Sequence, residues 1–478
     1  MTDPTRSQIK FVIAGATLTA FAAALWAPQV LNDGDSWWHV AAGRLMIASH
    51  GLIDTDPFSY TFAGRPWLNH EWLADVLFGA AFNLAGWGGV MLLTAIAAGL
   101  TAWLLARDLA RWLGGLPLIV VLGLALSLIG PHLLARPHLL ALPLLEIWAA
   151  GMVLARARGG GPAWALLPVM TLWANLHGSF LFGLSLTGVF ALEALIDAPA
   201  EKRVRVALRW GGFGVAAGVA ALLTPHGLDG LLLPLRLSGM ASLAHIGEWA
   251  PADFSSVGPL EVAILATLYG LLSKPIRLPP LRALLLLLLV YLALRHVRHE
   301  MLLALVAPLL LAGPMADAYG QRPQPRSAAA PLPPRLPSPW LAGLAVGVLA
   351  LAGARLLLRV VRVDGQAAPI SALSAVPQNL RTQPVLNDYA FGGYLIFEGV
   401  KPFIDSRADL YGDRFVMAYS GLAAGDAPAL AAVLKNSKVR WTILAPGTPL
   451  SAAMRAMPGW RLIHADRFAE VEVRDAPA

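Results

Sequence analysis

Acidic, basic and aromatic side chains gather in a few short stretches of an otherwise apolar sequence. The first is NDGDSWWH, residues 32–39, which follows the first hydrophobic segment. A carboxylate at such a boundary could take a proton from an acceptor hydroxyl group or bind a cation. We therefore take Asp35, with Asp33 beside it, as the candidate catalytic residue. The same stretch also fits a helix cap and an Asp-Gly turn, with the tryptophans at a membrane interface.

Arginine and histidine form two further clusters, PHLLARPH at residues 131–138 and RHVRHE at residues 295–300. The planar guanidinium group suits bidentate contacts with oxygen atoms, so each cluster could hold a phosphate. Arginines that anchor helix ends among lipid headgroups are the alternative. The candidate residues for binding a donor phosphate are Arg136, His138, Arg295, Arg298 and His299.

Other stretches combine tryptophan with histidine, amide or carboxylate groups, as in NHEW at residues 69–72, WANLHGS at 173–179 and HIGEW at 245–249. A sugar can stack its apolar face on tryptophan while its hydroxyl groups bond a carboxylate. Hydrogen bonds between helices, or a solvated loop, explain the same residues. The candidates for binding sugar or acceptor are Trp38, His39, His70, Glu71, Asn175, His177, His226, Glu248 and Trp249.

The composition fixes the class of protein that must position these groups. Of the 478 residues 57% are hydrophobic and 14% charged, and the mean hydropathy is +0.62, which indicates a polytopic α-helical membrane protein. The absence of cysteine excludes disulfides, thiolate metal sites and a cysteine nucleophile. The net charge of +7 is concentrated in short loops, so it indicates topology and not nucleic-acid binding.

Apolar runs predict about eleven transmembrane helices. The first run is retained, because no Ala-x-Ala type of cleavage site follows it. Arginine and lysine gather in one set of connections, and the clusters described above fall in the other set. By the positive-inside rule the N-terminus is cytoplasmic and the tail lies outside. The expected spans are 9–31, 86–106, 116–131, 138–155, 163–177, 179–197, 207–224, 259–273, 281–295, 300–316 and 340–358.

The sequence also predicts the structure of two connections between membrane helices. The first outer loop, residues 32–83, is expected to hold two amphipathic helices on the membrane surface. The first of these starts at Trp37 with Asp35 or Ser36 as its cap, and Gly51 ends it. Residues 321–339, rich in proline and arginine, are expected to form an irregular cytoplasmic connection before the last membrane helix.

The tail differs in character from the rest. Strands are expected at 384–387, 401–405, 439–444 and 460–464, with helices at 427–434 and 450–457, so residues 361–478 form a small α/β domain beside the membrane domain 1–360. The Gly392-Gly393 pair would allow the backbone to approach a ligand closely. Asp405, Arg407 and Asp409 would either bind an acceptor glycan or form an internal network of ion pairs.

The arrangement resembles the GT-C superfamily of membrane glycosyltransferases, whose protein mannosyltransferase and arabinosyltransferase members use polyprenyl-phosphate sugars. The resemblance rests on Asp33-Gly34-Asp35 after the first helix, the long first outer loop, the helix bundle and the soluble tail. It covers residues 9–320 in architecture and implies Asp35, then Asp33, as base or metal ligand, with Arg136, Arg295 and Arg298 at the lipid phosphate. The Asp-Glu pair of the protein mannosyltransferase-like members is missing.

The sequence thus predicts a bacterial inner-membrane glycosyltransferase with a periplasmic C-terminal domain. It would move a sugar, with inversion, from a polyprenyl-phosphate donor to a glycan, lipid or protein acceptor outside the cytoplasm. The cofactor is unknown, and a divalent cation such as Mg²⁺ or Mn²⁺ on Asp33 and Asp35 is compatible with it. A transporter or flippase for a lipid-linked saccharide, or a non-catalytic subunit of a polysaccharide assembly complex, is the alternative.

Overall fold

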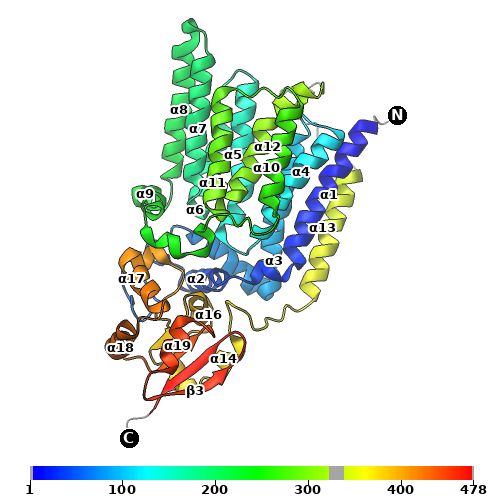
Figure 1. Cartoon of the computed structure of the whole chain (residues 1–478). Coiled ribbons are helices and arrows are strands. Elements are labelled where there is room, and N and C mark those ends of the chain that lie inside the picture. The colour runs from blue at the N-terminus through cyan, green and yellow to red at the C-terminus, as the bar shows by residue number, and fades with distance from the viewer. Residues whose placement is uncertain (1–3, 322–338, 476–478) are drawn as a thin grey trace.

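A computed structural model describes residues 4–321 and 339–475, and the chain forms a helix bundle with a smaller tail domain at one end (Figure 1). All eleven expected membrane segments are helical. Within the described ranges, seven helices are long and apolar enough to cross a membrane. Most of the expected connection at 321–339 lies outside the described residues. The bundle helices are α1 (Pro4–Trp26), α3 (Trp72–Leu109), α4 (Gly115–Ile129), α5 (Pro137–Ala157), α6 (Leu167–Leu176), α7 (Phe180–Asp197), α8 (Arg203–Ala221), α10 (Pro259–Ser273), α11 (Pro280–Arg295), α12 (Glu300–Ala318) and α13 (Pro339–Leu357).

Helix α3 is the centre of the bundle and packs against α1, α5, α6 and α13. It bends at Ala85 and Gly86, where Gly86 takes φ 57° and ψ −147°, a conformation that only glycine adopts without strain. The bend separates a first part, which the sequence analysis assigned to the first outer loop, from the long apolar part. The second expected loop helix is therefore the start of α3.

Helix α2 (Asp35–Ser49) lies between the bundle and the tail (Figure 1) and packs on α3 from one side and on α16 (Gly392–Phe397) from the other. Its caps differ from the expected ones. The Asp33 carboxylate accepts the backbone N–H of Asp35 at 2.9 Å, while the Ser36 hydroxyl donates to the carbonyl of Ala135 at 2.9 Å. The helix ends at Ser49, and His50, with φ 52°, is its C-cap in place of Gly51.

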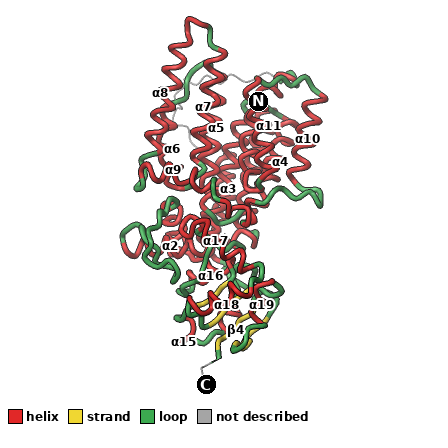
Figure 2. The backbone as a smooth tube through the Cα atoms, turned by 60° about the vertical axis from the view of Figure 1, so that its left-hand side comes forward, coloured by secondary structure: helices red, strands yellow, loops and turns green. Residues whose placement is uncertain are grey.

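The tail contains a four-stranded sheet in the order β1-β2-β4-β3. β1 runs parallel to β2, and β4 is antiparallel to both β2 and β3. The sheet lies on the side of the tail away from the bundle (Figure 2). The elements are α14 (Ile370–Ala375), α15 (Gln378–Arg381), β1 (Val385–Asn387), α16, α17 (Ala408–Ala423), α18 (Ala427–Asn436), β2 (Trp441–Leu444), α19 (Pro449–Arg455), β3 (Trp460–Ala465) and β4 (Glu470–Arg474).

Three of the four expected strands and both expected tail helices are present. The strand expected at 401–405 is wrong. The Asn387 side chain accepts the N–H of Phe403 and donates to the carbonyl of Ile404, both at 2.8 Å. These backbone groups are therefore satisfied without a neighbouring strand. The missed strand is β4, which carries two glutamates, of which Glu470 is buried and paired with Arg455.

The glycine pair of the tail does allow a close backbone approach, but the partner is the chain itself. A Cβ atom on Gly393 would lie 2.0 Å from the carbonyl oxygen of Gly34. Helix α16 therefore rests directly on the backbone that begins α2. Because Gly34 separates the two candidate catalytic aspartates, the tail holds the position of that segment.

A buried ion-pair network completes this contact. The Arg407 guanidinium bonds Asp405 of the tail at 2.7 Å and Asp56 of the segment before α3 at 2.8 Å, and all three side chains are fully buried. It also lies 4.7 Å from the ring centroid of Trp67. Of the two roles open for Asp405 and Arg407, these contacts match the network of ion pairs.

Candidate active site

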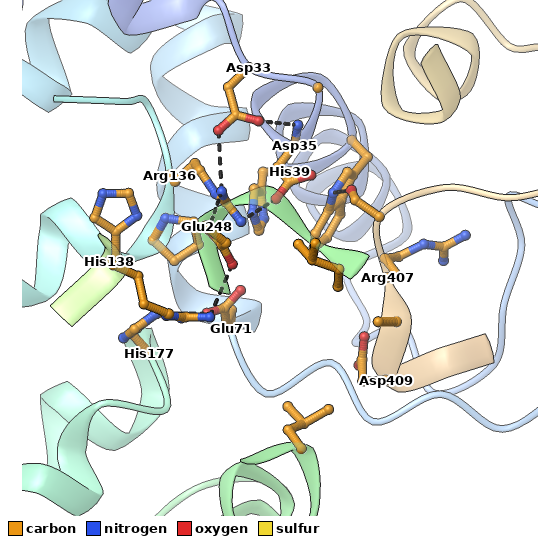
Figure 3. Close-up of a pocket in the computed structure, with 18 of the residues that line it drawn as sticks. Asp33, Asp35, His39, Glu71, Arg136, His138, His177, Glu248, Arg407 and Asp409 are labelled. Atoms are coloured by element: carbon orange, nitrogen blue, oxygen red, sulfur yellow. Dashed lines mark hydrogen bonds and ion pairs between the residues drawn. The ribbon is translucent and has the colours of Figure 1, made fainter. Parts of the chain in front are cut away.

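A cavity of about 350 Å³ lies between the bundle and the tail. The bundle side of the cavity is formed by the start of α2, the segment before α3, the start of α5 and the turn before α7. Residues 246–249, Arg298 and the tail complete its walls. All six of the stretches singled out in the sequence therefore contribute to one cavity (Figure 3). Tyr389, Ser406 and Asp409 form the tail side of the cavity.

Arg136, just before α5, is the centre of the charged groups. It pairs with Asp35, lies 3.4 Å from an oxygen of Asp33 and donates to Glu248 at 2.8 Å. Arg298 donates to the other oxygen of Glu248 at 3.0 Å and lies 4.4 Å from the Trp249 ring centroid. Figure 3 shows Asp33, Asp35 and Glu248 around the side chain of Arg136.

Burial and ion pairing set the charge of these groups. Burial opposes ionisation of Glu248, but Arg136 and Arg298 outweigh it and lower the pKa of Glu248 to about 2. Burial raises the pKa of Asp33, although Arg136 opposes the rise. Burial also disfavours the charged form of Arg136, yet Asp35, Glu248 and Asp33 raise its pKa well above the ordinary value. The guanidinium of Arg136 is therefore a permanent cation among three acids.

A histidine–aspartate pair lies on the neighbouring wall. His39 Nδ1 is 2.6 Å from Asp75 Oδ1, and the second oxygen of Asp75 accepts the Asn69 amide at 2.8 Å. Burial lowers the pKa of His39, but the attraction of Asp75 more than offsets this and raises it. Asp75 thus fixes the orientation of His39, whose ring lines the cavity.

A second cavity, of about 430 Å³, adjoins the first and shares His70, Glu71, Arg136, His138, His177 and Arg298 with it. It extends into the bundle between α5, α7, α11 and α12. Its inner walls are apolar and include Leu142, Leu145, Leu181, Phe182, Leu292, Met301 and Leu302. A charged chamber therefore continues into an apolar one.

Twelve of the predicted site residues line the first cavity, namely Asp33, Asp35, Trp38, His39, His70, Glu71, Arg136, His138, His177, Glu248, Trp249 and Arg298, and His299 lines the second. Three others line neither. Arg295 is exposed at the end of α11. Asn175 accepts the Trp72 indole N–H and donates to two backbone carbonyls. His226 bonds the carbonyl of Asn69 at 2.9 Å.

The sequence analysis named Arg407 and Asp409 of the tail but missed Trp67, Tyr389 and Ser406. Trp67 donates to Asp409 at 2.9 Å, and Trp38 donates to Ser406 at 3.0 Å. The stretch that carries Trp67 runs directly into NHEW, which is the only local signal for it. The tail residues lie more than 300 positions from their partners in the chain, so no spacing rule connects them.

The carboxylates do not fit a metal site. Among residues 4–321 and 339–475 no group of three or more histidine, aspartate or glutamate side chains is placed to hold a metal ion. Asp33, Asp35 and Glu248 converge instead on the guanidinium of Arg136. The position between them holds a cation of the chain itself, so we derive no step through a metal.

No protein-family model and no curated protein sequence matches the chain. Solved structures do. ArnT from Cupriavidus metallidurans superimposes with a TM-score of 0.52 over 98% of this chain and 99% of ArnT, at 13% identity bound to undecaprenyl phosphate and 16% in the apo state. Arabinofuranosyltransferase AftD from Mycobacteria gives 0.50 at 14% identity over 98% of this chain and 40% of AftD. Both are GT-C glycosyltransferases.

The chain has the GT-C fold. This confirms, at the level of the fold, the resemblance and the fold class predicted from the sequence, a polytopic membrane bundle with a small C-terminal domain. At identities of 13–16% the likeness concerns the fold alone. What this GT-C fold does must therefore be argued from the residues of its cavities.

Proposed function

We propose that the protein is a membrane glycosyltransferase that moves a sugar from a polyprenyl-phosphate donor to an acceptor. The observation that carries the proposal is the continuity of the charged cavity with the apolar one. A lipid-linked sugar needs a polar chamber for its sugar and phosphate and an apolar space for the chain beside them. The two cavities supply both, and their shared wall carries Arg136 and Arg298.

The shared wall suits the phosphate of the donor. As the bond to the sugar breaks, negative charge grows on the phosphate oxygens, and preorganised cations in a buried site stabilise it strongly. Arg298 and Arg136 are such cations, with His138 beside them. The acceptor would come from the tail side, where Trp38, Trp67 and Asp409 face the cavity. Attack from the side opposite the phosphate gives inversion at the anomeric carbon.

The same proposal includes the orientation of the protein in the membrane. We place the cavity and the tail outside the cytoplasm of a bacterial inner membrane, with the N-terminus inside. Arg107 and Arg156 lie near the far ends of α3 and α5, and Arg156 is about 30 Å from Arg136 at 1.5 Å per helical residue. Basic residues at that end support a cytoplasmic side. The lipid bound to ArnT, undecaprenyl phosphate, supports the donor class.

Filling the apolar cavity tests the donor site. Leu302 lines it from α12, so Leu302→Trp places an indole where the first part of the chain would lie. We expect saturable binding of undecaprenyl phosphate by the wild-type protein and at least a tenfold weaker affinity in the variant, about 1.4 kcal/mol. The control is Leu287→Trp, at a side chain 65% exposed on α11, which should bind as wild type. Equal affinity in both variants would contradict the assigned chain site.

A further inference from the structure

The carboxylates of the first cavity differ in what they contact. Asp33, Asp35 and Glu248 all face Arg136, and Asp409 accepts the indole N–H of Trp67. Glu71 is the exception within the described residues, since it has no ion pair with an arginine and neither of its carboxylate oxygens accepts a hydrogen bond. Its nearest polar partners are Nε2 of His177 at 3.6 Å and Nε2 of His70 at 3.8 Å.

Glu71 also has the position that the reaction requires. It lines the charged cavity, which would hold the sugar and the acceptor, as well as the adjoining apolar one. Asp35, the candidate from the sequence, lies on the wall with Arg136 and has a guanidinium on its carboxylate. A carboxylate whose lone pairs bind an arginine is less available to an acceptor hydroxyl group.

The neighbouring histidine, His177, faces Glu71. The backbone N–H of Ser179 donates to His177 Nδ1 at 3.2 Å, so in a neutral ring the proton sits on Nε2, the atom that faces Glu71. Burial, together with Arg298, lowers the pKa of His177 well below its ordinary value and keeps the ring neutral. His177 can therefore direct an N–H group toward the carboxylate without adding a charge.

Burial raises the pKa of Glu71, against the pull of His70 and His39. A base is most effective when its pKa lies close to the working pH. Glu71 is thus better matched to proton transfer near neutral pH than an ordinary exposed glutamate.

We propose that Glu71 is the general base of the transfer, an inference that rests on the proposed function. An oxygen of Glu71 takes the proton of the acceptor hydroxyl group as the hydroxyl oxygen bonds the anomeric carbon. The bond from that carbon to the phosphate oxygen breaks, and its electron pair leaves with the polyprenyl phosphate. The proton then passes from Glu71 to water. Asp35 acts through Arg136, as a positioning residue.

The test is turnover by the purified full-length protein on the undecaprenyl-phosphate sugar that the wild type uses. Glu71→Gln should lower kcat on the order of 10³-fold with undecaprenyl phosphate binding unchanged, which shows that the variant is folded. Glu71→Asp should keep measurable turnover. Asp229→Asn, at an exposed carboxylate on α9 (Gly227–Ser238), is the matched control and should turn over as wild type.

The pH profile separates a base from a structural role. The base must be ionised, so kcat/KM should fall as the pH drops through the pKa of Glu71, above the 4.5 of an ordinary glutamate. The residual activity of Glu71→Gln should lack this fall. Wild-type kcat in Glu71→Gln would overturn the inference while leaving the glycosyltransferase intact. Absence of wild-type turnover on every donor would overturn the proposed function itself.

Discussion

Replacing Arg136 with methionine is expected to lower turnover on the order of 10³-fold, the effect of losing one strong electrostatic contact to a transition state. The substitution leaves Asp33, Asp35 and Glu248 facing one another without their shared cation. Like charges at this distance cannot all stay ionised in a buried site. The donor phosphate would lose one of its two cations. It would also lie beside carboxyl groups that no arginine neutralises.

Arg136→Lys separates charge from geometry. Lysine keeps the positive charge but lacks the fork that reaches several carboxylates together, so we expect a loss between those of the wild type and Arg136→Met. Turnover in both variants is measured as kcat/KM with the same donor. Wild-type kcat/KM in Arg136→Met would show that this arginine neither binds the donor nor organises the acids around it.

Replacing Arg407 with methionine is expected to destabilise the contact between the tail and the bundle by roughly 3–5 kcal/mol. Asp405 and Asp56 are fully buried and would be left without a cation. The free energy of unfolding, from denaturant titration of tryptophan fluorescence, measures the effect, and limited proteolysis shows whether the tail has come loose. We expect proteolysis to cleave the tail of the variant more rapidly than that of the wild type.

The matched control is Arg461→Met in β3. Arg461 is 68% exposed and 3.9 Å from Asp475, and exposed pairs of this kind contribute about 0–1 kcal/mol. An equal loss of stability in the two variants would mean that the buried network does not hold the tail in place.

The bundle could be predicted because its signal is local. Apolar runs such as residues 86–106 and 340–358 identify membrane helices without knowledge of their neighbours. Alternation of charged and polar connections placed Asp35, Arg136 and Glu248 on one side. Because these residues lie on the same side of the membrane, they were predicted to form one site. The structure places all three around one cavity.

The pairing inside the site could not be predicted in the same way. Spacing along the chain did not indicate that Arg136 binds Asp35, because Asp35 begins α2 and Arg136 precedes α5. The two meet only when the bundle packs. It also did not indicate that the Glu71 carboxylate has no hydrogen-bond partner among the described residues, since that depends on which groups other loops present. Trp67 and Asp409 meet across 342 positions. In the tail, the side chain of Asn387 bonds the backbone of residues 403 and 404 in place of a neighbouring strand. The alternation of residues along the sequence cannot predict such a contact.

The central claim is tested most directly by incubating the purified full-length protein with a panel of undecaprenyl-phosphate sugars and measuring released undecaprenyl phosphate. Solubilised envelope glycans and lipids serve as acceptors. The account predicts release from at least one donor by the wild type and release slower on the order of 10³-fold by Arg136→Met. Saturable binding of undecaprenyl phosphate without release from any donor would contradict it and favour a transporter of a lipid-linked saccharide.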